Sequence, residues 1–373
     1  MITFQTQPIK TIENAYNNQV YRFTGDSNKT AVRCEWTIFK GSGIFRQGEI
    51  TSNLNSFYFN AKSPITSLFN QNNFVDNILP EVSNFLKLDA TLYDELSFLF
   101  KVIYNDGTNE EVEFDKEYLK SVESLLRPLE VENTVFKPLI ENNYLNYWEG
   151  VPFDISFFSD SQRDVNIINT STGVSSEFTF QKGVNRLFLS SGDTFTAGFE
   201  NQIPLLTDQI NVLDFIDVST SNSLVTLQVK KHKFCQAPYL KWFNRKGGWS
   251  YFQFERVFQE NTSFTNKEFL DNDIENLQET RSNFQTTGKE SELSQRYLTP
   301  SLNLDEQENF IDIYGSPKVY YYNGVRNQPM ELTNWKEVSI DNSTEETLNT
   351  KILNKSFEVN IELPNVYNQT YAR

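Results

Sequence analysis

The side chains best suited to catalysis are scarce in this chain of 373 residues. It contains one histidine, His232, and two cysteines, Cys34 and Cys235. A histidine base needs a carboxylate that orients its ring and a nucleophile that it deprotonates. His232 instead lies between Lys231 and Lys233, whose charges lower its pKa, and no Gly-x-Ser-x-Gly motif supplies a serine. The pattern therefore favours a structural histidine over a catalytic one.

Acidic residues are abundant, but their spacing specifies no pair for catalysis. A glycosidase needs two carboxylates about 5–10 Å apart, and a chain with 49 acidic residues offers many unspecified pairs. Asp271–Glu275 begins like a calcium loop, yet its sixth position is Asn276 instead of glycine, and Glu279 comes too early for the bidentate ligand. We therefore interpret Asp271–Glu275 as a run of solvated charged residues and not as a calcium site. We predict no catalytic residue, no bound metal and no cofactor.

One segment, residues 239–252, is both aromatic and basic, and three interpretations compete for it. Exposed rings and cations there would stack on the bases of a single-stranded nucleic acid. Gly247-Gly248 would alternatively make a tight turn whose flanking rings are buried. Tryptophan, tyrosine and arginine are also the residues that dominate subunit contacts. We favour packing and interface together, and predict these interface residues: Tyr239, Trp242, Arg245, Gly247, Gly248, Trp249, Tyr251 and Trp148.

Charge and composition limit the partners. Thirty-three Lys and Arg against 49 Asp and Glu give a net charge of −16, which disfavours nucleic acid and anionic membranes. The chain has 32 Phe, 17 Tyr and 5 Trp, too many rings for a disordered acidic chain. No secretory signal and no apolar stretch of about 20 residues is present, so we expect synthesis in a cytoplasm, with Cys34 and Cys235 reduced and buried.

The elements that position these residues are mainly strands. Short runs of alternating apolar and polar residues recur with turn signals between them, which is typical of β-sandwiches. The clearest hairpin joins 97–104 to 111–114 through Asp106-Gly107, because glycine supplies the positive φ of the turn. Residues 65–81 have loose helical spacing. In 357–363 the apolar residues occupy every second position, as in a strand with one solvated face.

These patterns predict a mainly β protein of two or three β-sandwich-like modules with an extended polar arm. Two prolines near 128 and 138 suggest a boundary. We predict a β-rich domain at 1–130, a β-sandwich at 131–230, an aromatic and basic docking segment with the arm at 231–310, and a C-terminal β segment at 311–373. The arm itself is expected at about 263–300, where the sequence is mostly polar and charged.

The segment 239–252, together with the preceding Trp148-Glu149-Gly150-Val151-Pro152-Phe153, resembles uncharacterised virion or tail-module proteins of Bacteroidetes phages and prophages. The similarity continues through 315–320 and 357–364 and covers the C-terminal two thirds of the chain. It implies a virion component and carries no catalytic residue.

The resulting hypothesis is a structural protein of a bacteriophage particle, in the tail, baseplate or neck, located in the virion and assembled as a symmetric ring. Its expected partners are copies of itself and other virion proteins. The alternative is a receptor- or glycan-binding tail-tip module, in which Trp148, Trp249 or Tyr320–Tyr322 stack on host surface sugars. A glycan-cleaving enzyme is a third possibility, for which the sequence names no carboxylate.

Overall fold

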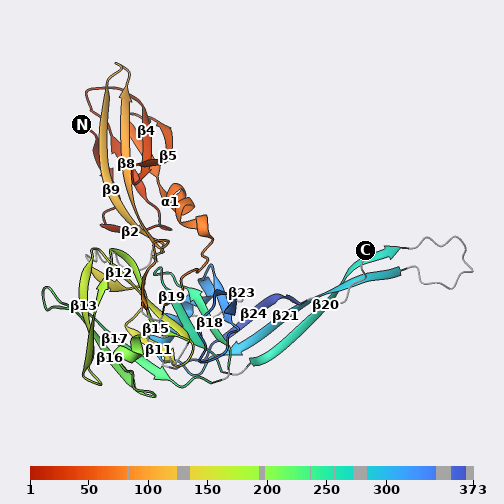
Figure 1. Ribbon diagram of the computed structural model, residues 1–373. Coiled ribbons are helices and arrows are strands. Elements are labelled where there is room, and N and C mark those ends of the chain that lie inside the picture. The colour runs from red at the N-terminus through yellow and green to blue at the C-terminus, as the bar shows by residue number, and fades with distance from the viewer. Residues whose placement is uncertain are drawn as a thin grey trace, which may run out of the picture.

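The computed structural model describes residues 1–81, 84–123, 135–192, 198–235, 237–255, 257–271, 284–341 and 354–366. Within these ranges the prediction of a mainly β protein with β-sandwich modules is confirmed. Figure 1 shows an N-terminal sandwich standing on a larger body, from which a long hairpin projects sideways. Most of the predicted boundary, residues 127–134 of 127–138, and most of the calcium-like run, residues 272–279, lie outside the described residues.

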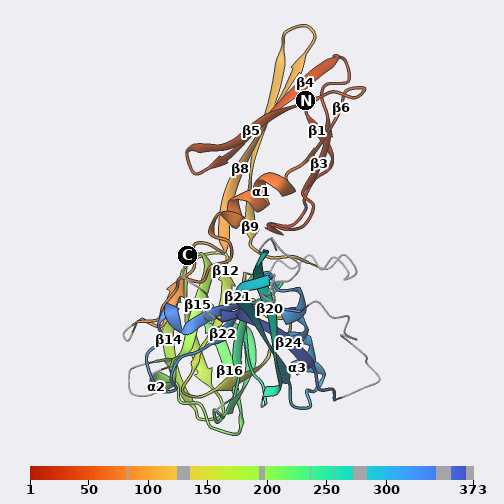
Figure 2. The same ribbon diagram turned by 90° about the vertical axis from the view of Figure 1, so that its right-hand side faces the viewer.

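The N-terminal module consists of two sheets that face each other (Figure 2). The five-stranded sheet has the order β2-β9-β8-β4-β5, with β2 Ile12–Asn14, β4 Ala31–Lys40, β5 Gly43–Thr51, β8 Tyr93–Tyr104 and β9 Asn109–Leu119. The three-stranded sheet has the order β1-β3-β6, with β1 Thr3–Thr6, β3 Val20–Thr24 and β6 Ser56–Asn60. The predicted hairpin is β8–β9, and Gly107 has the expected positive φ of 80°. Of the loosely helical stretch, only the start is helix: α1 Lys62–Phe69, then the 3-10 turn η1 Asn70–Asn72.

The second module is a sandwich of a four-stranded and a five-stranded sheet. The first has the order β10-β12-β15-β7, with β7 Leu86–Leu88, β10 Phe136–Pro138, β12 Pro152–Ser159 and β15 Gly183–Ser191. The second has the order β11-β17-β16-β13-β14, with β11 Tyr144–Trp148, β13 Arg163–Asn169, β14 Val174–Phe180, β16 Ile210–Asp217 and β17 Ser223–His232. The short helix α2, Phe199–Gln202, packs on β15.

The chain crosses between these modules before the predicted boundary. After η1 it leaves the N-terminal sandwich, contributes β7 to the second one by pairing with β15, and returns as β8. A domain of residues 1–130 is therefore too simple a division, because residues 86–88 belong to the sheet of the second module.

The C-terminal module is a seven-stranded sheet of order β19-β18-β22-β23-β24-β21-β20. Its strands are β18 Tyr239–Phe243, β19 Trp249–Gln253, β20 Val257–Asp271, β21 Phe284–Leu298, β22 Val319–Tyr322, β23 Trp335–Ile340 and β24 Glu358–Val366. It also contains the helix α3 Leu304–Ile311 and the 3-10 turns η2 Asp312–Gly315 and η3 Leu332–Asn334. The predicted alternation in β24 is confirmed, since Phe357, Val359 and Ile361 are fully buried.

Two hydrophobic cores organise the described residues. One fills the N-terminal sandwich and includes Tyr21, Phe23 and Phe100. The other runs without a break from the second sandwich into the C-terminal sheet. The predicted segments 131–230, 231–310 and 311–373 are therefore packed as one body, because β12 and α3 both contact β19 or its neighbours across the seam.

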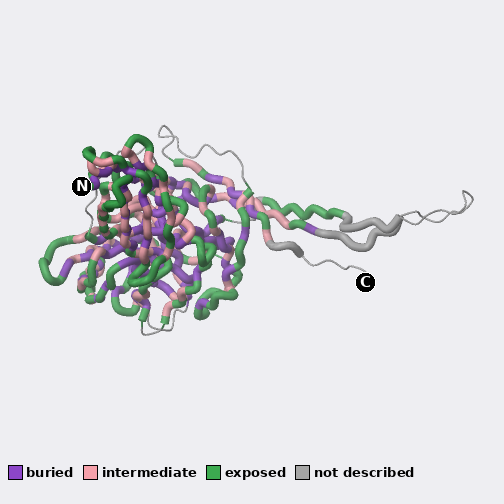
Figure 3. Tube along the Cα trace, turned by 90° about the horizontal axis from the view of Figure 1, so that it is seen from above, coloured by how far each residue is buried: buried purple, intermediate pink, exposed green. Residues whose placement is uncertain are grey.

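The polar arm is a paired hairpin and not a loop. β20 and β21 run antiparallel, and β21 joins the main sheet through β24. Figures 1 and 3 show the hairpin leaving the body, and residues 259–265 of β20 are exposed. No helix in the described part of the chain is long and apolar enough to span a membrane.

Candidate functional site

The predicted interface residues come together in one place, around the β18–β19 hairpin. Tyr239 and Trp242 lie in β18, and each is 1% exposed. Trp249 and Tyr251 lie in β19 and are also buried, as is Trp148 at the end of β11. Ring pairs link Tyr239 to Tyr251 and to Trp148, with centroids 6.0 and 6.1 Å apart. The sequence therefore grouped these rings correctly, but they lie inside the molecule.

The two glycines of the turn lie where the three modules meet. Gly247 has φ of +91°, and a β-carbon there would approach the carbonyl oxygen of Lys120 to 2.9 Å. At Gly248 a β-carbon would lie 2.7 Å from the carbonyl oxygen of Leu139 and 3.1 Å from the β-carbon of Ser156. Lys120 follows β9 of the N-terminal module, whereas Leu139 and Ser156 belong to the second sandwich. Glycine is required here because backbones approach closely and the first residue of the pair is left-handed.

Hydrogen bonds complete this junction. The amide N–H of Val122 donates to the carbonyl of Arg245 at 2.8 Å, and the side chain of Asn244 donates to the carbonyl of Leu139 at 3.0 Å. The Arg245 guanidinium donates to Glu141. The turn thus docks onto both of the other modules.

These positions confirm the packing part of the prediction, but the interface part finds few exposed side chains here. Among the eight predicted residues, only Arg245 retains substantial side-chain exposure, at 32%. The others are buried by the same chain, because the face of β19 that an isolated sheet would expose is covered by β11, β12 and α3. The segment joins modules within one chain, and its aromatic side chains are not available to a second molecule.

A buried ionic network, which the sequence analysis did not identify, lies beside this hairpin. Arg186 of β15 is 0% exposed and binds two carboxylates at once. Its Nε and Nη2 donate to Asp154 at 2.9 and 2.7 Å, and its Nη1 and Nη2 donate to Asp76 at 2.5 and 3.1 Å. Lys241 of β18 donates to Asp76 at 2.8 Å, and the Tyr251 hydroxyl donates to Asp154. The network connects the crossing segment to both modules of the body.

The electrostatics of the network hold its charges in place. Burial would raise the pKa of Asp76, but the charges of Arg186 and Lys241 outweigh burial and lower it. Burial lowers the pKa of Lys241, and Asp76 opposes that effect. The Lys241 ammonium also lies 4.2 Å from the ring centroid of Trp335, a favourable cation–π distance. The hydrogen bonds and ion pairs of the network hold Asp76, Asp154, Arg186 and Lys241 together and are typical of a structural role.

The signal that could have revealed the network is a charged residue inside an apolar strand. Asp154 interrupts Phe153 and Ile155, and Arg186 stands directly before Leu187. Both strands are buried along nearly their whole length, since one face packs in the sandwich and the other against the C-terminal sheet. A strand buried on both faces shows no polar face, so an isolated charge in it predicts a buried partner.

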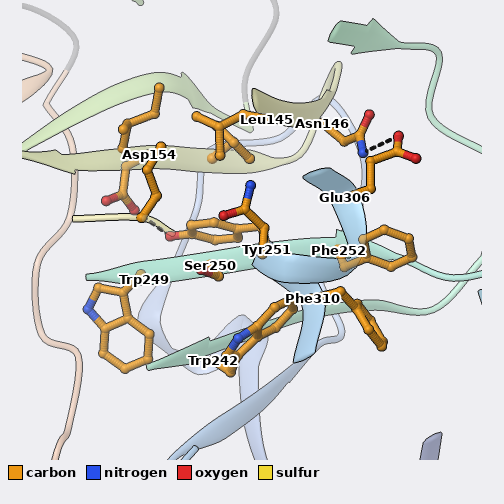
Figure 4. Close-up of a pocket in the computed structure, with 14 residues that line it drawn as sticks. Leu145, Asn146, Asp154, Trp242, Trp249, Ser250, Tyr251, Phe252, Glu306 and Phe310 are labelled. Carbon is orange, nitrogen blue, oxygen red and sulfur yellow. Dashed lines mark hydrogen bonds between the residues drawn. The ribbon is translucent and has the colours of Figure 1, made fainter. Parts of the chain in front are cut away.

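A small cavity of about 40 Å³ lies at the same seam (Figure 4). Rings of Trp242, Tyr251 and Phe310 line it, together with Asp154, which accepts the Tyr251 hydroxyl bond. Ligand pockets usually measure about 300–1,000 Å³, so this space accommodates water and no larger ligand. It is a packing defect between modules.

His232 has the structural role that the sequence favoured. Its Nε2 lies 2.8 Å from the side-chain oxygen of Asn146, and its ring stacks on Trp148 with centroids 5.5 Å apart. Burial is the main cause that lowers its pKa, with Lys230 adding to the effect. Among the cysteines, Cys34 is buried and burial raises its pKa to about 12, whereas Cys235 is exposed, contrary to the prediction.

Asp312 is the carboxyl for which we expect a clear pH effect. It lies in η2, 3.2 Å from Nε of Arg245, and is 8% exposed. Burial raises its pKa to about 6 from the ordinary 3.8, with Arg245 opposing and Glu141 reinforcing the shift. Because the folded state binds the proton more tightly than the unfolded state, this group's contribution is present below pH 4 and is lost as the pH rises through 6.

Asp312→Asn is therefore expected to flatten the decline in stability with pH. Between pH 4 and 7 the free energy of unfolding should fall by about 2–3 kcal/mol less in the variant than in the parent. Urea unfolding at a series of pH values measures this. Asp208→Asn, at an exposed carboxyl, controls for the loss of one negative charge, and parallel curves for Asp312→Asn and parent would contradict the prediction.

The outermost strand, β20, is the accessible feature of this region. Residues 259–265 are all exposed, and β20 packs chiefly on β21. A 15-residue strand is about 50 Å long, so the hairpin extends far beyond its base. Isolated two-stranded hairpins are at best marginally stable in water. The arm therefore exposes a long strand that has few contacts with the body.

No protein-family model and no curated protein matches the chain. Solved structures with similar folds include fibronectin(III)-like modules of Clostridium thermocellum CbhA, with 10% identity and a TM-score of 0.19, covering 62% of this chain and 95% of that one. They also include Dpr2 Ig1-Ig2 in complex with DIP-Theta, with 7% identity, a TM-score of 0.21, and coverage of 98% and 90%. A tetra-tandem repeat of a large adhesion protein has 10% identity, a TM-score of 0.24, and coverage of 81% and 56%. These structures and this chain share only the β-sandwich fold class.

Proposed function

We propose that this chain is a structural component of a bacteriophage particle, in the tail, baseplate or neck, and that it works by assembling with copies of itself and with other virion proteins into a symmetric ring. The observation that carries the proposal is the β20–β21 arm. Residues 259–265 of β20 are exposed, and the length of the arm is out of proportion to the part of β21 that pairs with β24. Arms that reach over a neighbouring subunit supply such missing contacts.

The rigid body supports the same proposal. The second sandwich and the C-terminal sheet share one core, and the ionic network ties the crossing segment to it. An assembling subunit has to present its arm in a fixed direction, and a hydrophobic core that continues from one module into the other favours this. The resemblance of residues 148–153 and 239–252 to phage tail-module proteins supports a location in the phage particle.

The glycan-binding alternative loses the residues on which it depended. Sugar stacking needs exposed rings, but Trp148, Trp249, Tyr320 and Tyr322 are all less than 9% exposed. Tyr321 is only partly exposed and packs against the body core. We therefore propose no glycan site at these positions.

Removal of the arm is expected to abolish assembly while leaving the fold intact. Asn261 pairs with Ser294, so replacing residues 262–293 with Asn-Gly closes β20 and β21 through a two-residue turn. The variant should unfold at the same urea concentration as the parent, yet its native mass spectrum should contain monomer only. Phage carrying the deletion should yield no complete particles.

The location is tested separately, by mass spectrometry of purified particles of the phage that encodes the chain. The protein is expected in multiple copies per particle. Its absence from particles, with a monomeric parent chain in solution, would overturn the proposal.

A further inference from the structure

The edge of β20 is long and regular, and no strand of the described part of the chain pairs with it. β20 is the last strand of the seven-stranded sheet, so its outer backbone groups have no neighbouring strand among the described residues. The pairing with β21 shifts register between Val257 and Gln259 and again between Asn266 and Glu268. Between these irregularities, residues 259–266 form an unbroken ladder. The bulges confine the regular edge to this one segment.

Between its two bulges, this edge lacks the features that usually prevent association. Protected edges carry lysine, proline or a bulge. Residues 259–265 read Gln-Glu-Asn-Thr-Ser-Phe-Thr, with one charge, no lysine and no proline. Such a segment is able to accept another strand along its whole length.

An apolar stripe runs from the body core onto the same strand. Ile361 is fully buried, and Leu363, two residues further along β24, is partly buried against the core. Leu363 pairs with Leu293 of β21, which in turn pairs with Thr262 of β20. Phe264 is two residues from Thr262, therefore on the same face, and it is 65% exposed. The stripe ends at the free edge with a large uncovered ring.

We propose that β20 pairs with β20 of a second copy, antiparallel about a twofold axis at Ser263, so that two seven-stranded sheets become continuous. This rests on the proposed function and names the contact that it uses. An antiparallel twofold pairing is self-complementary, so one strand supplies both sides. Residues of the same face oppose each other, and the register places Thr262 opposite Phe264 of the second copy.

Charge also fits this register. The two Glu260 side chains are separated by six positions, or about 20 Å, so they do not face each other. The pairing covers Phe264 with the second copy's strand and extends the apolar stripe across the axis. In a ring of such copies, a twofold contact joins subunits in pairs and gives an even copy number.

A disulfide reports the register directly. Opposed Cα atoms in an antiparallel pair lie about 4.5–5.5 Å apart, within the roughly 7 Å limit for a disulfide. Ser263→Cys, in a Cys235→Ser background that removes the exposed native thiol, is expected to form a linked dimer under mild oxidation. Gln259→Cys in the same background is the matched control. Its two thiols would lie about 27 Å apart in this register, so it should stay unlinked.

Phe264→Lys tests the same contact without a cross-link. It is expected to weaken the dimer at least tenfold in sedimentation equilibrium, whereas Tyr58→Lys, at an exposed ring of β6 in the N-terminal module, should leave it unchanged. Equal cross-linking of Ser263→Cys and Gln259→Cys, or an unaltered dimer in Phe264→Lys, would overturn the β20 pairing and leave the particle location standing. A linked dimer of a protein absent from particles would support the pairing and overturn the proposed function.

Discussion

Arg186→Met is expected to lower the free energy of unfolding by about 3–5 kcal/mol, because it leaves buried carboxylates without their cation. Arg186 is 0% exposed and makes four hydrogen bonds, two to Asp154 and two to Asp76. Methionine fills much of the same space but donates nothing. Lys241 still faces Asp76, so the larger part of the loss should arise at Asp154, which retains only the Tyr251 hydroxyl among the partners described here.

Urea unfolding followed by tryptophan fluorescence measures this loss, since Trp148, Trp242, Trp249 and Trp335 all lie in the body core. Arg33→Met is the matched control. Arg33 is 44% exposed and pairs with surface glutamates, so the same substitution should cost no more than about 1 kcal/mol.

A second substitution separates uncompensated charge from lost packing. Arg186→Met leaves Asp154 and Asp76 without their hydrogen bonds to the guanidinium. Adding Asp154→Asn removes one of these two negative charges and should recover part of the stability that Arg186→Met loses. If Arg186→Met destabilised no more than Arg33→Met, the network would contribute nothing to holding the modules together.

Trp242→Ala is expected to destabilise the body by about 3–5 kcal/mol, the usual loss when a buried large ring is truncated. Trp242 is 1% exposed in β18, and its ring lies 5.9 Å from that of Phe310 in an edge arrangement. It stands at the seam where α3 packs against the hairpin, so its loss opens a cavity between elements that cannot close around it.

Trp242→Phe is the informative comparison. The indole N–H of Trp242 is buried and has no hydrogen-bond partner among the described residues, so phenylalanine keeps an aromatic ring and removes an unsatisfied donor. We expect it to cost less than half as much as alanine. Equal losses for both variants in urea unfolding would show that the indole is held by something other than ring packing.

Arg186→Met and Trp242→Ala are expected to affect the stability of the subunit and not its assembly. Both variants weaken the body without touching β20, so they should reduce the yield of folded protein but not the pairing of what folds. The arm deletion and Phe264→Lys should instead weaken assembly and leave the stability of the subunit unchanged. This contrast separates the stability of the subunit from its assembly.

Local pattern was sufficient for the strands that have one wet face. In β8–β9 and β24 each second residue faces a core, so hydrophobic alternation and the Asp106-Gly107 turn predict the element directly. The sequence also predicts strands at Phe153–Phe158 and Arg186–Leu189, which β12 and β15 confirm although both are buried along nearly their whole length. Local pattern could not show β7, because three residues pairing with β15 carry too little periodicity to be seen.

The aromatic cluster illustrates the difference at the site. Composition and spacing singled out Trp242, Gly248 and Trp249 as residues that contact something, and they do. What they contact was decided by the fold: β11, β12 and α3 of the same chain cover the hairpin, whereas the polar hairpin after it is left projecting.

By itself, then, the sequence determined a β-rich chain that is poor in catalytic side chains, with an aromatic segment suited to close packing and a polar arm. Only the tertiary structure decided which of these two faces the outside. Burial and ion pairing join residues more than 100 positions apart, such as Asp76 and Arg186, and no local pattern encodes which distant strand will cover a given face.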